Sequence, residues 1–172
     1  MKGKPRAKGP LEVTDLEALA LGYLNRFDCS VSKLRTHLRQ TIRRRGGDRA
    51  ELERHIEVLL ERYQASGLLN DARFAENLAA RISERGGSRR AIVQRLRQRG
   101  VTSAVAEASV PKTPGAELEA ARAFVRRRRL GPHRPEAERL ENRRRDLAAL
   151  ARHGFDHETA VRALSYGTDD DF

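Results

Sequence analysis

The sequence has 172 residues but no tryptophan, only five phenylalanines and three tyrosines, and a single cysteine. Aromatic and β-branched residues favour strands, whereas the leucine, alanine, arginine and glutamate that dominate this chain favour helices. We therefore expect an all-α protein. One cysteine cannot form an intrachain disulfide, so Cys29 is expected to be a small buried apolar residue in a protein of the reducing cytoplasm.

Long apolar runs are also missing. No run approaches the roughly 20 apolar residues that a transmembrane helix needs, and the basic stretch MKGKPRAKGP lacks the apolar segment that follows it in a secretory signal. We expect a soluble, cytoplasmic protein whose residues 1–12 form a disordered basic arm. The apolar content of 38% is low for one large core, so several small cores are expected.

Motifs of the common enzyme classes are absent. The chain has no glycine-rich phosphate loop, nucleophile elbow or metalloprotease motif. No cysteine pair accompanies the histidines, and Gly154 interrupts their one four-residue spacing, so a zinc site is not expected. The five histidines are His37, His55, His133, His153 and His157. The sequence therefore favours a non-enzymatic protein with no catalytic residues, no metal and no cofactor.

Positive charge is what the chain has in excess. Lysine and arginine number 35 against 24 aspartates and glutamates, which gives a net charge of +11. A surface of this charge attracts polyanions or an acidic protein. Nucleic acid is therefore one expected partner.

Apolar periodicity and capping residues predict three tandem modules of three helices. Thr14 and Glu17 fit a capping box at the first helix, Ser30 or Ser32 can cap the second, and Gly67 can end the third. The expected ranges are 13–67, 68–110 and 116–166 for the modules, 111–115 for a linker, and 167–172 for an acidic tail. Asn70, Ser88, Thr102 and Asp156 are expected to start later helices.

The second and third modules align through their glycines. Leu96 precedes Gly100 by four residues as Leu150 precedes Gly154, and an apolar residue follows each glycine. Small repeated units of this kind form an elongated, curved array that can lie along another extended surface. The middle helix of the third module is expected to face the core with its apolar residues, namely Leu140, Leu147, Leu150 and Ala151.

Arginines recur on the middle helix of each module. In the first module they repeat every four residues and predict a cationic ridge, whose like charges cost about 0.2–0.5 kcal/mol per pair. In the second they border the core stripe of Ile92, Val93 and Leu96, and an RRR run lies in the third. The candidate partner-binding or DNA-binding residues are Arg35, Arg39, Arg43, Arg90, Arg95, Arg97, Arg99, Arg143 and Arg144.

Two other interpretations apply to these segments. Arg126 to Arg129 follow the apolar residues of a predicted helix, where cations complement the negative end of the helix dipole. Residues 88–109 could form a helix-turn-helix. However, its second helix, SAVAEASV, lacks the side chains that contact base edges.

Three segments resemble the RecX family of recombination regulators. They are LEALALGYLNRFDCSVSKLRTHL, which starts at Leu16, GLLNDARFAENLAARISERGGSRRAIVQRLRQRGV, which starts at Gly67, and LARHGFDHETAVRAL, which ends at Leu164. The resemblance implies a modular three-helix-repeat fold and a role in DNA repair, homologous recombination and the SOS response.

The same resemblance implies which protein this chain binds and how it changes that protein's activity. It implies binding to the RecA recombinase, especially to its filament on single-stranded DNA, with suppression of ATP hydrolysis and strand exchange and limited filament growth. The simplest state is a monomer, and the alternative function is a stand-alone basic DNA-binding module. Which module contacts protein and which contacts DNA is left open by the sequence.

Overall fold

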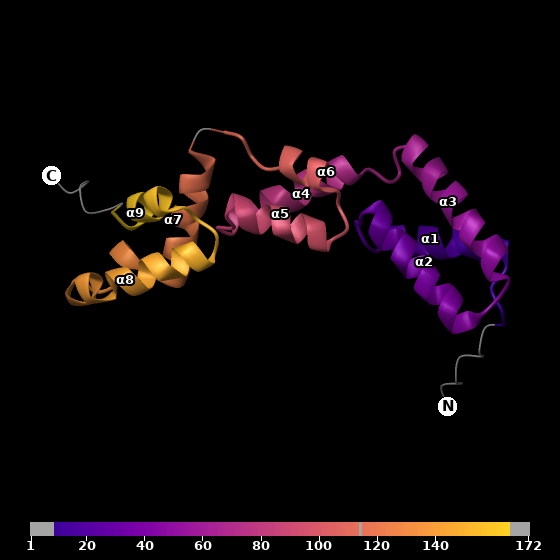
Figure 1. The fold of residues 1–172 in the computed structure, drawn as a ribbon, viewed down its shortest axis with the longest axis horizontal. Coiled ribbons are helices and arrows are strands. Elements are labelled where there is room, and N and C mark those ends of the chain that lie inside the picture. The colour runs from indigo at the N-terminus through magenta and orange to yellow at the C-terminus, as the bar shows by residue number, and fades with distance from the viewer. Residues whose placement is uncertain (1–8, 114, 166–172) are drawn as a thin grey trace, which may run out of the picture. The chain divides into compact units, whose positions relative to one another are not determined.

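The computed structural model describes residues 9–113 and 115–165, and all regular structure in these ranges is helical (Figure 1). This confirms the all-α prediction. None of the described helices is both long enough and apolar enough to cross a membrane. Residues 1–8 of the predicted basic arm and the predicted acidic tail lie outside the described residues.

The helices follow one another in three groups of three, as predicted. The first group is α1 (Val13–Leu24), α2 (Val31–Arg45) and α3 (Arg49–Ala65). The second group is α4 (Asp71–Glu84), α5 (Arg89–Gln98) and α6 (Ser103–Ala108). The third group is α7 (Ala116–Arg128), α8 (Glu136–Arg152) and α9 (His157–Ser165), with a short 3-10 helix, η1 (Gly131–His133), that the sequence did not predict.

Contacts along the chain divide it into two compact units. The first unit extends to Phe74 and includes Arg99–Val101, and the second comprises Ala75–Gln98 and the chain from Thr102 onward. The boundary between the units therefore falls within α4. Two separate clusters of buried apolar residues, one in the first helical group and one in the third, agree with the expectation of several small cores.

In the first group, α1, α2 and α3 each pack against the other two (Figure 1). Ser30 caps α2 by accepting a hydrogen bond from the backbone N–H of Lys33, as predicted. The predicted capping box at Thr14 is wrong, because α1 begins at Val13 with Glu12 as its N-cap. The reciprocal partner is Asp15, whose carboxylate accepts from the Glu12 N–H, so the helix starts two residues earlier.

In the third group, two residues that the sequence placed in the core are exposed. Leu140 is 87% exposed and Ala151 also faces solvent, so these two assignments were wrong. The inward face of α8 instead passes through Leu150 and the buried carboxylate of Asp146, one turn apart. Because the carboxylate of Asp146 finds partners inside the group, the helix is rotated so that Leu140 points outward.

A serine joint occurs twice and links segments that are far apart in sequence. The hydroxyl of Ser30 donates to the carbonyl of Arg99 at 2.5 Å, and the hydroxyl of Ser88 donates to the carbonyl of His153 at 2.6 Å. Both serines are fully buried, and each also accepts a backbone N–H at the start of its own helix. The first joint lies within the first unit and the second within the second unit.

The glycines that the sequence alignment paired complete these joints. Gly100 and Gly154 have φ angles of +83° and +97°, a region that favours glycine. A Cβ on Gly154 would lie 2.7 Å from the hydroxyl oxygen of Ser88. Glycine is thus required here both by its φ angle and by the close approach of the buried serine.

A substitution at Gly154 should show this requirement. Gly154→Ala is expected to lower the free energy of unfolding of the second unit by about 2–4 kcal/mol, because the left-handed conformation and the overpacking each contribute. Gly115→Ala is the matched control, since Gly115 has φ +83° but no atom near the added Cβ, and it should cost only about 1–2 kcal/mol. Urea unfolding followed by circular dichroism measures both. Equal losses of unfolding free energy in the two variants would mean that the close contact with Ser88 does not contribute to the requirement for glycine.

Candidate functional site

The predicted cationic ridge on α2 is partly neutralised. The guanidinium of Arg35 donates to Glu57 at 2.8 Å, and that of Arg39 donates to Glu53 at 2.7 Å. The hydrogen bond from Arg35 is also the main reason why the pKa of Glu57 lies below its ordinary value. Such half-exposed pairs stabilise by only about 0.2–1 kcal/mol, but they occupy the two arginines. Arg43 is exposed and forms no ion pair with any described residue.

The four predicted arginines at residues 90–99 are exposed and have no carboxylate partner among the described residues. Arg97 donates to the hydroxyl of Ser103 at 2.7 Å, and Arg95 donates to the side chain of Gln98 at 3.4 Å. These neutral acceptors leave the positive charges uncompensated. The other two of these four exposed arginines are Arg90 and Arg99.

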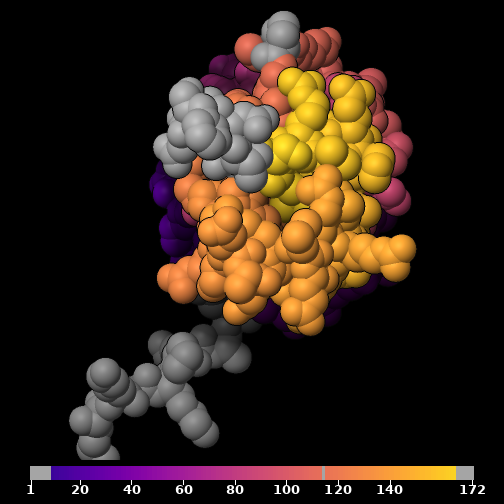
Figure 2. Space-filling view, turned by 90° about the vertical axis from the view of Figure 1, so that its left-hand side faces the viewer, coloured from indigo at the N-terminus to yellow at the C-terminus, as the bar shows by residue number. Residues whose placement is uncertain are grey.

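Arg143 and Arg144 lie on α8, the helix that forms much of the face shown in orange beside α9 in Figure 2. Both side chains are exposed, and neither pairs with a carboxylate of the described residues. Arg143 also lines a cavity of about 280 Å³ together with the exposed Leu140. The binding role of all nine predicted arginines stays a prediction, but their surroundings now differ, because Arg35 and Arg39 are paired and the others are not.

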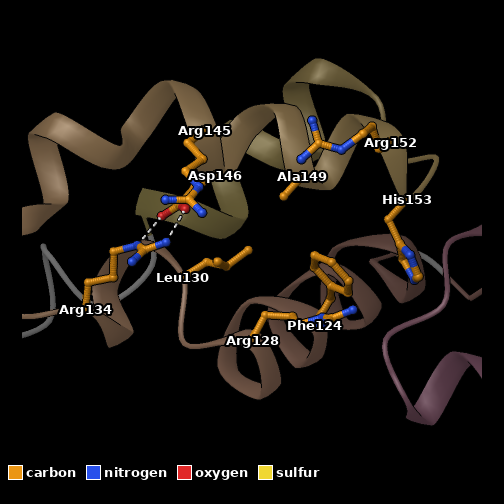
Figure 3. Close-up of a pocket in the computed structure, with 9 residues that line it drawn as sticks. All are labelled: Phe124, Arg128, Leu130, Arg134, Arg145, Asp146, Ala149, Arg152 and His153. Carbon is orange, nitrogen blue, oxygen red and sulfur yellow. Dashed lines mark hydrogen bonds and ion pairs between the residues drawn. The ribbon is translucent and has the colours of Figure 1, made fainter.

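The third helical group contains a larger cavity between α7 and α8, which we call the arginine cavity (Figure 3). Its volume is about 440 Å³. The residues that line it are Phe124, Arg128, Leu130, Arg134, Arg145, Asp146, Ala149, Arg152 and His153. Arg128 extends from α7, whereas Arg145 and Arg152 extend from α8. None of these arginines is among the predicted site residues.

The carboxylate of Asp146 is already satisfied within the cavity wall. Arg134 donates to it through two nitrogens, at 2.8 and 2.9 Å (Figure 3). The Gly131 N–H also donates to it, at 2.8 Å. Burial raises the pKa of the Asp146 carboxyl, but the hydrogen bonds from Arg134 and Gly131 outweigh it and hold the pKa below its ordinary value. Asp146 is therefore ionised at neutral pH, and its charge is balanced by Arg134.

The remaining arginines of the cavity have no such partner. Arg128, Arg145 and Arg152 are exposed, and none of them pairs with a described carboxylate. His153 stacks on Phe124 with ring centroids 4.3 Å apart. Burial and then the nearby charge of Arg127 lower the pKa of His153, so its ring is neutral at pH 7. The positive charge of the cavity thus comes from arginine alone.

A second hollow lies next to the arginine cavity and shares two residues with it. Its volume is about 380 Å³, and Arg152 and His153 line both hollows. On the α5 side it is lined by Arg90, whose Cβ would be 3.1 Å from a Cβ on Gly154. The Ser88 joint therefore extends the cationic surface from α8 to the predicted site residue Arg90.

The sequence contains one signal for this cavity. Arg145 and Arg152 are seven residues apart, which places them on one face of a helix. In the sequence, the helix dipole alone accounts for Arg128 at a helix end, and the segment around Arg152 is distinguished by its apolar repeat. The sequence does not show that α7 and α8 place Arg128, Arg145 and Arg152 around one cavity.

Other candidate chemistry is not assembled in the described residues. Among them, no three His, Cys, Asp or Glu side chains are placed to hold a metal ion. Cys29 is buried, as predicted, and burial is the main reason why its pKa is raised to about 11. Its thiol is therefore protonated at neutral pH, which suits an apolar packing role rather than a nucleophile.

Comparison with known proteins identifies relatives across most of the chain. Residues 70–110 match the family model of the second three-helix domain of RecX. The regulatory protein RecX of Myxococcus xanthus (strain DK1622) is 38% identical over 168 residues, covering 94% of this chain and 88% of the relative. The regulatory protein RecX of Thermobifida fusca (strain YX) is 34% identical and covers 87% and 79%.

A solved structure has the same fold. The crystal structure of RecX from Lactobacillus salivarius superposes with a TM-score of 0.67, covering 89% of this chain and 94% of that chain. Its sequence is 16% identical to this one, so this likeness concerns the fold.

The Asp146 pair should make stability depend on pH. Because the pKa of Asp146 is depressed in the folded state, its stabilisation is complete above the unfolded pKa of about 3.9 and is lost as pH falls through the lower folded pKa. Asp146→Asn is expected to cost about 3 kcal/mol at pH 7, since it leaves Arg134 without its charged partner, and less as the pH approaches 2. Urea unfolding at several pH values tests this. Glu141→Gln, on the exposed face of α8, is the control. A constant difference between wild type and Asp146→Asn from pH 7 to 2 would contradict the assignment.

Proposed function

Because the chain belongs to the RecX family of regulatory proteins, we propose that it binds the RecA recombinase and its filament on single-stranded DNA. Bound in this way, it inhibits ATP hydrolysis and strand exchange and limits extension of the filament. The protein thereby modulates DNA repair and recombination in the cytoplasm. It acts as a binding protein and not as an enzyme.

The observation that carries the proposal is the combination of family membership with uncompensated arginines. A filament of recombinase on DNA presents phosphates and acidic side chains, both of which attract guanidinium groups. Arg43 is exposed and has no carboxylate partner among the described residues, and the same holds for Arg90, Arg95 and Arg97 of α5, whereas Arg89 pairs with Glu107. The proposed contact set is Arg43, Arg90, Arg95, Arg97, Arg99, Arg143 and Arg144. Arg35 and Arg39 contribute less, because Glu53 and Glu57 already hold them.

The second candidate is a stand-alone DNA-binding module, which the net charge of +11 favours. Such a module would bind DNA equally well with and without recombinase. A regulator that binds the recombinase would inhibit its ATP hydrolysis directly. A module that only binds DNA would lower ATP hydrolysis only in proportion to the DNA that it covers.

The two functions separate in an ATPase assay. Purified protein is titrated into RecA on single-stranded DNA, and the regulator is expected to inhibit hydrolysis well below one molecule per recombinase subunit. Inhibition that disappears when DNA is added in excess, with no binding to the recombinase filament in a pull-down, would instead support the DNA-binding module.

A matched pair on α2 tests the role of uncompensated charge. Arg43→Gln and Arg39→Gln each remove one positive charge from the same helix, but only Arg39 is paired with a carboxylate. We expect Arg43→Gln to weaken filament binding by roughly 10-fold or more, as loss of one charge-assisted hydrogen bond of about 1.5 kcal/mol does, and Arg39→Gln to weaken it by less than about twofold. Binding is measured by fluorescence anisotropy on preformed filaments. Equal weakening of filament binding by the two substitutions would show that binding depends on net charge alone.

A further inference from the structure

We propose that the arginine cavity of the third helical group binds backbone phosphates of single-stranded DNA, so that this group holds the nucleic acid. The inference rests on the proposed function, because it assigns the DNA contact of that function to one part of the chain. The juxtaposition that carries it is that Arg128 on α7, beside the Phe124 ring, lines the same hollow as Arg145 and Arg152 on α8 (Figure 3).

The charge inside the cavity is unbalanced. Four arginines and one carboxylate line it, and Arg134 and Asp146 neutralise each other. Three guanidinium groups therefore remain without a described anionic partner. His153 adds no positive charge at neutral pH because burial lowers its pKa. Placing three like charges around one hollow is unfavourable unless an anion lies between them.

The chemistry of the wall suits a phosphate. Guanidinium groups present a planar fork of donors that can contact two phosphate oxygens at once. A concave surface with apolar walls also focuses the electrostatic field more strongly than a flat one, and here Phe124, Leu130 and Ala149 are the apolar residues of the lining. An anion that enters the cavity can therefore contact more than one arginine.

The adjoining hollow favours a chain of anions over a single carboxylate. Arg152 lines both hollows, and Arg90 continues the positive surface on α5. One acidic side chain of a protein partner could fill one hollow. Successive phosphates of a strand can occupy both. The observations therefore favour nucleic acid over an acidic protein segment.

The size of the cavity favours a single strand over a duplex. A flexible strand can bend so that its phosphates enter a hollow of about 440 Å³. Duplex DNA is stiff over roughly 150 base pairs and would contact only the rim. Proteins that bind single strands without sequence preference use positively charged grooves of this kind.

The experiment measures binding of the full-length protein to a fluorescein-labelled oligothymidine, with no recombinase present. The test variant is Arg145→Gln with Arg152→Gln, and the control is Arg81→Gln with Arg162→Gln. The control arginines are exposed residues of the same unit that do not line either hollow. Both variants change the net charge equally, and circular dichroism verifies that both remain folded.

The cavity variant should lose about 1.4 from the slope of log affinity against log salt between 50 and 200 mM, since each phosphate contact on a single strand contributes about 0.7. At 0.1 M salt this corresponds to a roughly 10- to 30-fold weaker affinity. The control should keep the wild-type slope and an affinity within about threefold, because its arginines contact no phosphate. An equal loss in both variants would overturn the proposal, since it would reflect net charge alone.

Recombinase inhibition by the same proteins separates this inference from the proposed function. If the cavity variant binds the oligonucleotide like wild type but no longer inhibits RecA, the cavity receives an acidic side chain of the recombinase and the inference is wrong. If wild type fails to inhibit RecA while the cavity variant still loses oligonucleotide affinity, the proposed function is wrong and the cavity assignment stands. No binding of wild type to the oligonucleotide at 50 mM salt also overturns the inference.

Discussion

The buried hydrogen bond between the hydroxyl of Ser88 and the carbonyl of His153 is the contact on which the cationic surface depends. It holds the first turn of α5 against the end of α8, and Gly154 allows the approach because it has no side chain. Arg90 and Arg152 consequently line one hollow. The two arginines belong to the second and third helical groups, and this joint brings them to one hollow, where they can act on one ligand.

Internal ion pairs decide which cations remain available. The carboxylates of Glu53 and Glu57 on α3 hold Arg35 and Arg39, and Asp146 holds Arg134. These pairs contribute to the fold and remove those arginines from the set that a partner can attract. No ion pair among the described residues holds Arg90, Arg95 or Arg97 of α5, or Arg128, Arg145 or Arg152 of the arginine cavity. A net charge of +11 is therefore distributed unevenly.

Local features of the fold were predictable from sequence, because they depend on neighbouring residues. The caps at Ser30, Thr102 and Asp156 and the left-handed glycine at Gly67 were predicted correctly. The orientation of α8 was not, since it depends on the burial of Asp146 against Arg134, twelve residues earlier. A carboxylate in the core is rare unless it is paired, so the apolar pattern pointed to Leu140 instead.

The site was only partly predictable for the same reason. The sequence showed that arginines accumulate on the middle helices, but it did not show that Glu53 and Glu57 oppose two of them. The arginine cavity was missed because its residues come from two helices that meet only in the folded chain. The ion pairs that hold Arg35, Arg39 and Arg134 join residues that are 12 to 22 positions apart in the sequence. Local sequence patterns do not reveal contacts of this range.

The most direct test of the central claim is to observe the arginine side chains during binding. In ¹⁵N-labelled protein, the Nε–H signals of Arg128, Arg145 and Arg152 should shift when a short oligothymidine is added. Those of Arg35 and Arg39 should stay in place, because their carboxylate partners are unchanged. Shifts of Arg35 and Arg39 with no change at the cavity arginines would contradict the account.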